Sequence, residues 1–242
     1  MDPTAKKTKL AELRFLHAFY YFELIKVFGP NLPWVDETNM LHIAPLPNTN
    51  SVWANVENDF KQAIINLPGI SDSAGHVNVW AAKAFYGKLL LFEGKYAQAK
   101  TVFDDVIGNG NTTSGAKYML QTNFDNNFNI LFNNNSESVF AQQASVDGLM
   151  NHKANPGYTI AYPYGSGPGG CCGFFQPSQS LVNSFQVDVS GLPLFDPNHV
   201  TFPFNNSDLK NDLGLSSLDA YIPDTSTAVD PRLDWSLDDE GL

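Results

Sequence analysis

The sequence predicts a mainly α-helical protein in which pairs of helices form a scaffold that carries an irregular, loop-rich region. Two observations support this fold class. Apolar residues recur at steps of three and four through much of residues 10–110, which is the spacing of one helical face. After Gly110, Asn, Gly and Pro become frequent and the helical spacing is lost. We therefore predict a helical scaffold over residues 1–110. The loop-rich region over residues 111–242, with few short strands, is expected to pack on it within a single domain.

Residues 78–110 hold the most regular part of the pattern, two short helices joined by a turn. Gly94 lies between them, and a residue without Cβ can end the first helix in the left-handed conformation. One face of each helix is marked by apolar and small residues: Val79, Ala82, Tyr86, Leu89 and Phe92 in the first, and Tyr96, Ala99, Phe103 and Val106 in the second.

The same segment has the spacing of a tetratricopeptide unit, a repeat of two packed helices. Gly87 and Ala99 take the positions where the two helices must approach closely, and Phe103 fills the groove between them. Lys83 stands where the repeat usually has Trp. The spacing therefore predicts close helix packing at the two small residues.

A strongly apolar helix is predicted over residues 10–28. It should be buried on most sides, because two neighbouring stripes of the helix are apolar. The two stripes consist of Leu13, Leu16, Tyr20, Leu24 and Val27, and of Phe15, Phe19 and Phe22.

A second helix is predicted over residues 52–67, with Asn50 or Ser51 as its cap. Its Phe, Ala and terminal Pro keep the spacing of a tetratricopeptide second helix, and Val56 takes the small-residue position. The residues that carry this spacing are Phe60, Ala63 and Pro68, and the remaining inward residues are Val52 and Leu67. Helices 10–28 and 52–67 thus resemble one repeat unit whose turn is replaced by an inserted loop over residues 30–50.

Further along the chain the predicted elements are short. A strand is predicted over residues 137–145, and a short helix runs from Ser178 or Gln179 to Val187. Glycines and prolines between residues 155 and 179 exclude a long helix there.

The chain of 242 residues is strongly acidic, with 14 Lys and Arg against 25 Asp and Glu and a net charge of −11. Such a surface disfavours phosphate backbones, so nucleic acid is not an expected partner. No apolar run reaches the ~20 residues that span a bilayer. The first residues hold no apolar signal-peptide segment.

No known catalytic pattern is present, because the sequence lacks a nucleophile elbow, a zinc-protease helix, a P-loop and a dinucleotide fingerprint. The histidines are scattered singly, which favours structural roles over metal ligation. Acidic residues between 188 and 212 could supply oxygens to calcium, although the EF-hand spacing is missing. The adjacent Cys171 and Cys172 are either two small buried thiols or a strained vicinal disulfide. We therefore expect no catalysis, no metal and no cofactor.

Aromatic residues in the loops are the better functional signal. A sugar ring has an apolar face and a rim of hydroxyls, so its site needs aromatic surface with amides or carboxylates around it. The alternative is that these rings pack onto the body that carries them. The candidate ligand-binding residues are Trp34, Tyr158, Tyr162, Tyr164, Phe174, Phe175 and Gln176.

Several separated segments form an ordered pattern along the chain. They are ELRFLHAFYYF at 12–22 followed by Phe28, Gly29, Leu32 and Pro33, WAAKA at 80–84, GKYAQAK at 94–100, SESVFA at 136–141, QPSQSLV at 176–182 and DPRL at 230–233. Together they resemble the SusD/RagB-like nutrient-binding lipoproteins of Bacteroidota outer membranes.

The resemblance implies a SusD-like α-α superhelix of tetratricopeptide-like helix pairs with a loop-rich ligand region mounted on it. Members are lipid-anchored at the cell surface and are not enzymes. They capture glycans and act as lids on a TonB-dependent SusC-like transporter. No lipoprotein signal or anchoring cysteine precedes residue 10, and the family's late helices are missing after Trp235. The chain is therefore expected to be the middle of a longer protein.

Two other functions remain open on the sequence. A helical-repeat module that binds a protein or peptide would use a helix face instead of loop rings. A glycan-cleaving enzyme would need two carboxylates ~5–10 Å apart in a cleft, and the sequence nominates no such pair.

Overall fold

A computed structural model gives the structure of the protein. It describes residues 2–41, 46–71, 73–141, 181, 184–194 and 228–233. The chain divides into two compact units, Met1–Gln143 and Ala144–Leu242. That the loop-rich region packs on the scaffold stays a prediction.

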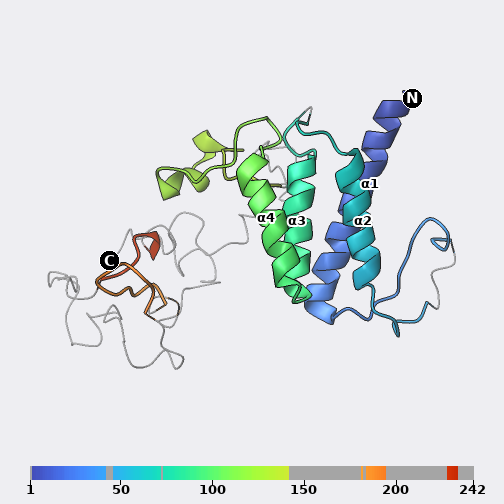
Figure 1. Cartoon of the computed structure of the whole chain (residues 1–242), viewed down its shortest axis with the longest axis horizontal. Helices are drawn as coiled ribbons and strands as arrows, with labels where there is room; N and C mark the ends of the chain where they lie inside the picture. Colours follow the sequence, from blue (N-terminus) through green and yellow to red (C-terminus); the bar gives the residue numbers. More distant parts are fainter. Residues whose placement is uncertain are drawn as a thin grey trace, which may run out of the picture. The chain divides into compact units, whose positions relative to one another are not determined.

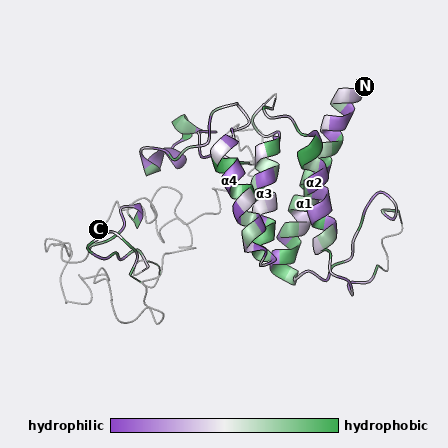
Figure 2. Cartoon of the chain, viewed as in Figure 1, coloured by the Kyte–Doolittle hydropathy of each residue, from purple (hydrophilic) through white to green (hydrophobic). Residues whose placement is uncertain are grey.

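Four α-helices in two pairs form the first unit (Figure 1). They are α1 Pro3–Phe28, α2 Trp53–Asn66, α3 Val79–Phe92 and α4 Tyr96–Asn109, followed by two short 3-10 helices, η1 Phe124–Asn127 and η2 Ile130–Phe132. Each α-helix packs against the next one in the chain, and hydrophobic residues interleave with hydrophilic ones on all four (Figure 2). The predicted mainly helical fold of helix pairs is confirmed. None of the helices in the described part has the length and hydropathy needed to cross a membrane.

No strand occurs among the described residues, where the β-type contacts are isolated bridges. The predicted strand over 137–145 is therefore wrong for residues 137–141, which form turns and bends. Local hydrogen bonding explains the difference. The Asn135 side chain accepts from the Glu137 N–H at 2.8 Å, and the Glu137 side chain accepts from the Gln121 N–H at 2.7 Å. The first bond bends the chain locally, and the second holds Glu137 against a segment 16 residues earlier, so residues 137–141 do not extend as a strand.

Helix α1 begins at Pro3, earlier than the predicted start at residue 10. The Asp2 side chain caps it by accepting a hydrogen bond from the Ala5 N–H at 2.9 Å, and proline suits the first helical position. The helix ends at Gly29, whose φ of 79° lies in the left-handed region and whose N–H donates to the Ile25 carbonyl at 2.9 Å.

Apolar residues occupy two opposite faces of α1, and one of these faces is buried. The prediction that this helix is buried on most sides is wrong, because Tyr20 is 63% exposed and Val27 is 74% exposed. Leu13 and Leu24 are exposed on the same face. Helical spacing identifies apolar stripes but does not say which stripe meets a partner. The buried residues of α1 are Ala11, Phe15, Ala18, Tyr21, Phe22 and Ile25.

The inserted loop leaves α1 and returns to α2 at nearly the same point. Asn31 and Ser51 form an isolated antiparallel bridge, and the Val52 N–H donates to the Pro30 carbonyl at 2.9 Å. Val52 is the N-cap residue of α2 and no side chain caps this helix, so the prediction of a cap at Asn50 or Ser51 is wrong. The backbone at Ser51 and Val52 pairs with the start of the loop, so it is not free to form a capping turn. The predicted inward residues Val52, Val56, Phe60, Ala63 and Leu67 are all buried.

The turn between α3 and α4 confirms the prediction for Gly94, whose φ is 75°. The Gly94 N–H donates to the Leu91 carbonyl at 3.0 Å, and the Lys95 N–H donates to the Leu90 carbonyl at 2.9 Å. These two bonds form a Schellman motif, which satisfies carbonyls at the helix end.

The close packing predicted at Gly87 is also present. A Cβ built on Gly87 would lie 2.9 Å from Cε1 of Phe103 on α4. Real Cβ atoms do not approach ring carbons so closely, so the pair α3–α4 requires a residue without a side chain at this position.

Glu57 on α2 connects the two helix pairs. Its carboxylate accepts from Lys61 at 2.8 Å and also binds Lys95, the N-cap residue of α4. Burial by itself raises the pKa of Glu57, but the hydrogen bonds from the two lysines outweigh it and lower the pKa to about 2. Glu93 binds the same Lys95 at 2.6 Å, and burial raises the pKa of Glu93.

A pH-dependent stability follows from the depressed pKa of Glu57. The folded-state pKa of about 2 is below the ordinary value of 4.5, so this stabilisation is present above about pH 4.5 and is lost as the pH falls towards 2. We expect Glu57→Gln to lower the free energy of unfolding at neutral pH and to have a much smaller effect near pH 2. Urea unfolding of both proteins across this range measures the difference. A constant difference at every pH would contradict the assignment.

The described residues of the second unit show two short contacts. Gln186 forms a bridge with Val229, and Val187 forms one with Pro193. The short helix predicted to reach Val187 is therefore wrong at its C-terminal end, because residues 186 and 187 pair with other segments. Asp188 closes the turn by accepting from the Ser190 and Leu192 N–H groups, at 2.8 and 3.0 Å.

Candidate functional site

Most of the predicted ligand-binding residues lie outside the described residues. These are Tyr158, Tyr162, Tyr164, Phe174, Phe175 and Gln176. Cys171 and Cys172 also lie outside them. Their assignment stays a prediction, and Trp34 is the predicted site residue whose surroundings the structure gives.

Trp34 packs on α1 through the inserted loop. Its ring centroid lies 4.5 Å from that of Tyr21 and 4.7 Å from that of His17. The indole N–H donates to Asp36 Oδ2 at 3.1 Å, and the Asn39 side chain donates to the Trp34 carbonyl at 3.0 Å. Trp34 is thus half-buried and held in place, so any ligand would meet a ring of fixed orientation.

His17 joins the inserted loop to both helices of the first pair. Its Nδ1 lies 2.6 Å from Asp59 Oδ2, and its Nε2 lies 2.8 Å from the Val35 carbonyl oxygen. A carboxylate and a carbonyl can only accept, so both ring nitrogens donate and the imidazole is protonated in this arrangement. The hydrogen bond to Asp59 accordingly raises the pKa of His17 above its usual 6.5, against the opposing effect of burial.

Arg14 completes this cluster. It donates to Asp59 Oδ1 at 3.0 Å and to Glu37 Oε1 at 2.5 Å. Asp59 is buried with 1% exposure, so two cations on α1 satisfy one buried carboxylate on α2. The cluster fixes the loop to the scaffold. Its carboxylates, Asp59 and Glu37, are bound by Arg14 and His17, so their role is structural.

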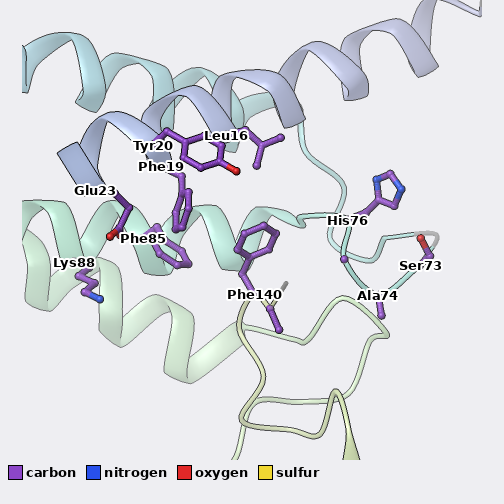
Figure 3. Close-up of a pocket in the computed structure, with 12 residues that line it drawn as sticks. Leu16, Phe19, Tyr20, Glu23, Ser73, Ala74, His76, Phe85, Lys88 and Phe140 are labelled. Carbon is purple, nitrogen blue, oxygen red and sulfur yellow. The ribbon is translucent and has the colours of Figure 1, made fainter. Parts of the chain in front are cut away.

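A hollow of about 810 Å³ lies between α1, α3 and the two loops at residues 73–76 and 140–141 (Figure 3). Aromatic rings line its wall. The Phe85 ring centroid lies 5.3 Å from that of Phe19, and the Phe140 centroid lies 5.9 Å from that of Phe19, both in edge-to-face geometry. Phe15 beneath them is fully buried and contacts all three rings. Edge-to-face packing of this kind fixes ring orientation.

Charged groups stand at one end of this hollow, which we call the aromatic pocket. Glu23 comes from α1 and Lys88 from α3, and both side chains lie at the same end in Figure 3. His76 and Ser73 line the opposite end. His76 Nδ1 lies 2.8 Å from Glu12 Oε1, which ties the 73–76 loop to α1. The pocket therefore combines a rigid aromatic wall with both hydrogen-bond donors and acceptors.

No pattern in the sequence predicts this pocket. Phe140 lay within the predicted strand, and Phe19 was assigned to a buried helix stripe. The loop at 73–76 has no motif of its own. The residues meet because α1 and α3 both pack against α2, which is a long-range consequence of the fold.

Among the described residues that line the aromatic pocket, Glu23 is the only carboxylate, whereas hydrolysis by paired carboxylates needs two. Within the described ranges, no group of three or more His, Cys, Asp or Glu side chains is placed to hold a metal ion.

The two helix pairs, with their close contact at Gly87, define a tetratricopeptide-like scaffold. Comparison with known proteins then shows that the chain is similar to SusD-like proteins. A SusD-like protein of Bacteroides ovatus is 31% identical over 156 residues, which are 59% of this chain and 27% of that protein. No protein-family model matches the chain.

Solved structures agree with this relationship. A SusD superfamily protein from Bacteroides vulgatus is 28% identical with a TM-score of 0.50, over 58% of this chain and 29% of that one. A structure solved with a xylogluco-oligosaccharide is 28% identical with a TM-score of 0.51, over 60% of this chain and 31% of that one. A SusD-like protein of Bacteroides fragilis, at 23% identity, shares the fold with a TM-score of 0.61 over 81% of this chain and 38% of its own. The chain thus spans about a third or less of the first two of these structures.

Proposed function

We propose that this protein binds oligosaccharides and does not cleave them. The observation that carries the proposal is the similarity to a structure solved with a xylogluco-oligosaccharide. Among its described lining residues the aromatic pocket has a single carboxylate, which supports binding without hydrolysis.

The finer proposal concerns place and partner. As a SusD-like homologue, the protein would act at the surface of the bacterial outer membrane, held there by a lipid anchor. It would deliver its glycan to a TonB-dependent SusC-like transporter. Co-purification of the two proteins tests this step, and failure of a SusC-like transporter to retain the protein would count against it.

We propose the loop aromatics and Trp34 as the main ligand contacts, with Tyr158, Phe174 and Gln176 among them. Isothermal calorimetry and affinity electrophoresis against a panel of polysaccharides test this. We expect the combined variant Tyr162→Ala, Tyr164→Ala, Phe175→Ala to weaken binding by at least tenfold, because each stacking ring contributes about 1 kcal/mol. Ile107→Ala, an exposed apolar residue on α4, is the control. Unchanged binding by the triple variant would contradict the proposed loop site. The appearance of hydrolysis products would instead support the hypothesis of a glycan-cleaving enzyme.

A second candidate function rests on the exposed face of α1. Leu13, Tyr20, Leu24 and Val27 form an apolar surface at helical spacing. Such a surface suits an apolar face of a partner helix, as in a helical-repeat protein-binding module. Peptide binding without any saccharide binding would favour this alternative.

A further inference from the structure

We propose that the aromatic pocket is a second saccharide-binding subsite, on the helical scaffold and separate from the loop aromatics, that takes a neutral sugar unit. This inference rests on the proposed binding function and adds a location and a ligand class to it. The pocket volume of about 810 Å³ falls in the range of small-ligand sites and leaves room for at least one sugar ring.

The aromatic wall supplies the surface for the apolar face of a sugar. Phe19, Phe85 and Phe140 hold one another in edge-to-face contacts, so their exposed surfaces are pre-organised. Tyr20 extends this wall, since its ring centroid lies 5.4 Å from that of Phe19 while 63% of the residue remains exposed. A ligand that covers Tyr20 would bury an aromatic ring that the described structure leaves in water.

The charged end supplies the groups for hydroxyls. Lys88 forms no ion pair with the described residues, so its three donors are open to a ligand. Glu23 binds Lys26 at 2.6 Å through Oε2, and a carboxylate has acceptor sites for further donors. A sugar hydroxyl both donates and accepts, so adjacent hydroxyls can use the carboxylate and the ammonium together.

The chemistry of the charged end favours a neutral ligand over an acidic one. A sugar hydroxyl can donate to Glu23 and accept from Lys88, the two charged residues that line this end. A uronate carboxylate has no proton to donate and would lie beside the like charge of Glu23. The pocket is therefore assigned to neutral sugars and not to uronic acids.

The test uses the 242-residue chain, labelled with ¹⁵N, and a xylogluco-oligosaccharide as the probe. We expect the amide signals of residues 73–76 and 88 to shift on titration. Tyr20→Leu and Lys88→Ala should each weaken that local binding by about 2–10-fold, on the scale of one aromatic or hydrogen-bonding contact. Tyr20→Phe should retain binding, because it keeps the ring.

Matched controls are Tyr96→Leu and Lys100→Ala, an exposed tyrosine and an exposed lysine on α4 outside the pocket. They should bind as the unchanged protein does. An oligogalacturonate of similar length should bind more weakly than the neutral probe. The variants replace exposed side chains, and circular dichroism confirms that each remains folded.

The outcomes separate the two proposals. Saccharide binding that is insensitive to Tyr20→Leu and Lys88→Ala overturns the pocket assignment and leaves the proposed function standing. Absence of binding to any saccharide overturns both. Stronger binding of the oligogalacturonate than of the neutral probe overturns the ligand class. Shifts at residues 73–76 and 88 with an apolar peptide but not with the oligosaccharide would assign the pocket to a protein partner.

Discussion

Gly87→Leu is expected to lower the free energy of unfolding of the helical unit by about 3 kcal/mol or to prevent folding altogether. Even the first added carbon would lie 2.9 Å from Cε1 and 3.0 Å from Cζ of Phe103. Leucine adds three more carbons, so the ring must leave the groove or α3 and α4 must separate. Thermal unfolding measures the effect, with a decrease in Tm of roughly 6–12 °C expected for a unit of this size.

Gly108→Leu is the matched control for this prediction. Gly108 also lies within a helix, α4, but no atom lies within 4 Å of the Cβ it would gain. We expect no loss of stability there, because leucine has a higher helix propensity than glycine. Phe103→Ala should restore part of the stability of Gly87→Leu by emptying the groove. A folded Gly87→Leu protein of unchanged Tm would contradict the tetratricopeptide assignment.

Asp59→Ala is expected to lower the free energy of unfolding by about 2–3 kcal/mol at slightly acidic pH. The substitution removes a buried carboxylate that accepts from Arg14 at 3.0 Å and from His17 at 2.6 Å. The Arg14 and His17 side chains are partly exposed, so water can replace some of the hydrogen bonds that they lose with Asp59. Urea unfolding measures the effect. Asp104→Ala is the control, because the exposed pair Lys100–Asp104 contributes little, about 0.5 kcal/mol.

The effect of Asp59→Ala should depend on pH in a defined direction. The folded-state pKa of His17 is raised above 6.5, so protonated His17 contributes stability that is complete below about pH 6.5. That contribution is lost as the pH rises through the folded-state pKa. The difference between the two proteins should therefore be larger at about pH 5.5 than at about pH 9. A pH-independent difference would show that His17 is not protonated in this cluster.

Short-range features of the fold could be predicted from the sequence. The hairpin of α3 and α4 was located because Gly87, Gly94 and Phe103 have meaning at fixed spacing. Glycine at a close approach, glycine at a helix end and an aromatic ring in a groove are local requirements. The inward residues of α2 were predicted for the same reason, since one clear stripe leaves a single choice of face.

Helix α1 shows where local pattern fails. Two of its faces are apolar, and spacing cannot decide which one meets α2. The predicted cap of α2 was wrong for a similar reason, because Ser51 pairs with Asn31 across the inserted loop. Both errors depend on contacts with residues distant in the sequence.

Only part of the candidate site could be predicted from the sequence. Loop aromatics could be named from composition, and they stay a prediction outside the described residues. The aromatic pocket could not be named, because its wall combines Phe19, Phe85 and Phe140 from three separate segments.

By itself, the sequence determined the helix pairs and the close packing at Gly87, because these depend on residue types at short, fixed spacings. It also showed the similarity to SusD-like proteins, because several short segments occur in a fixed order along the chain. The tertiary structure alone decided which face of α1 is buried and that a pocket forms between α1 and α3. It alone also showed that His17 makes hydrogen bonds to both Asp59 and the Val35 carbonyl. The physical reason is that burial and pocket shape arise from packing between distant segments, whereas helical periodicity is a property of each segment alone.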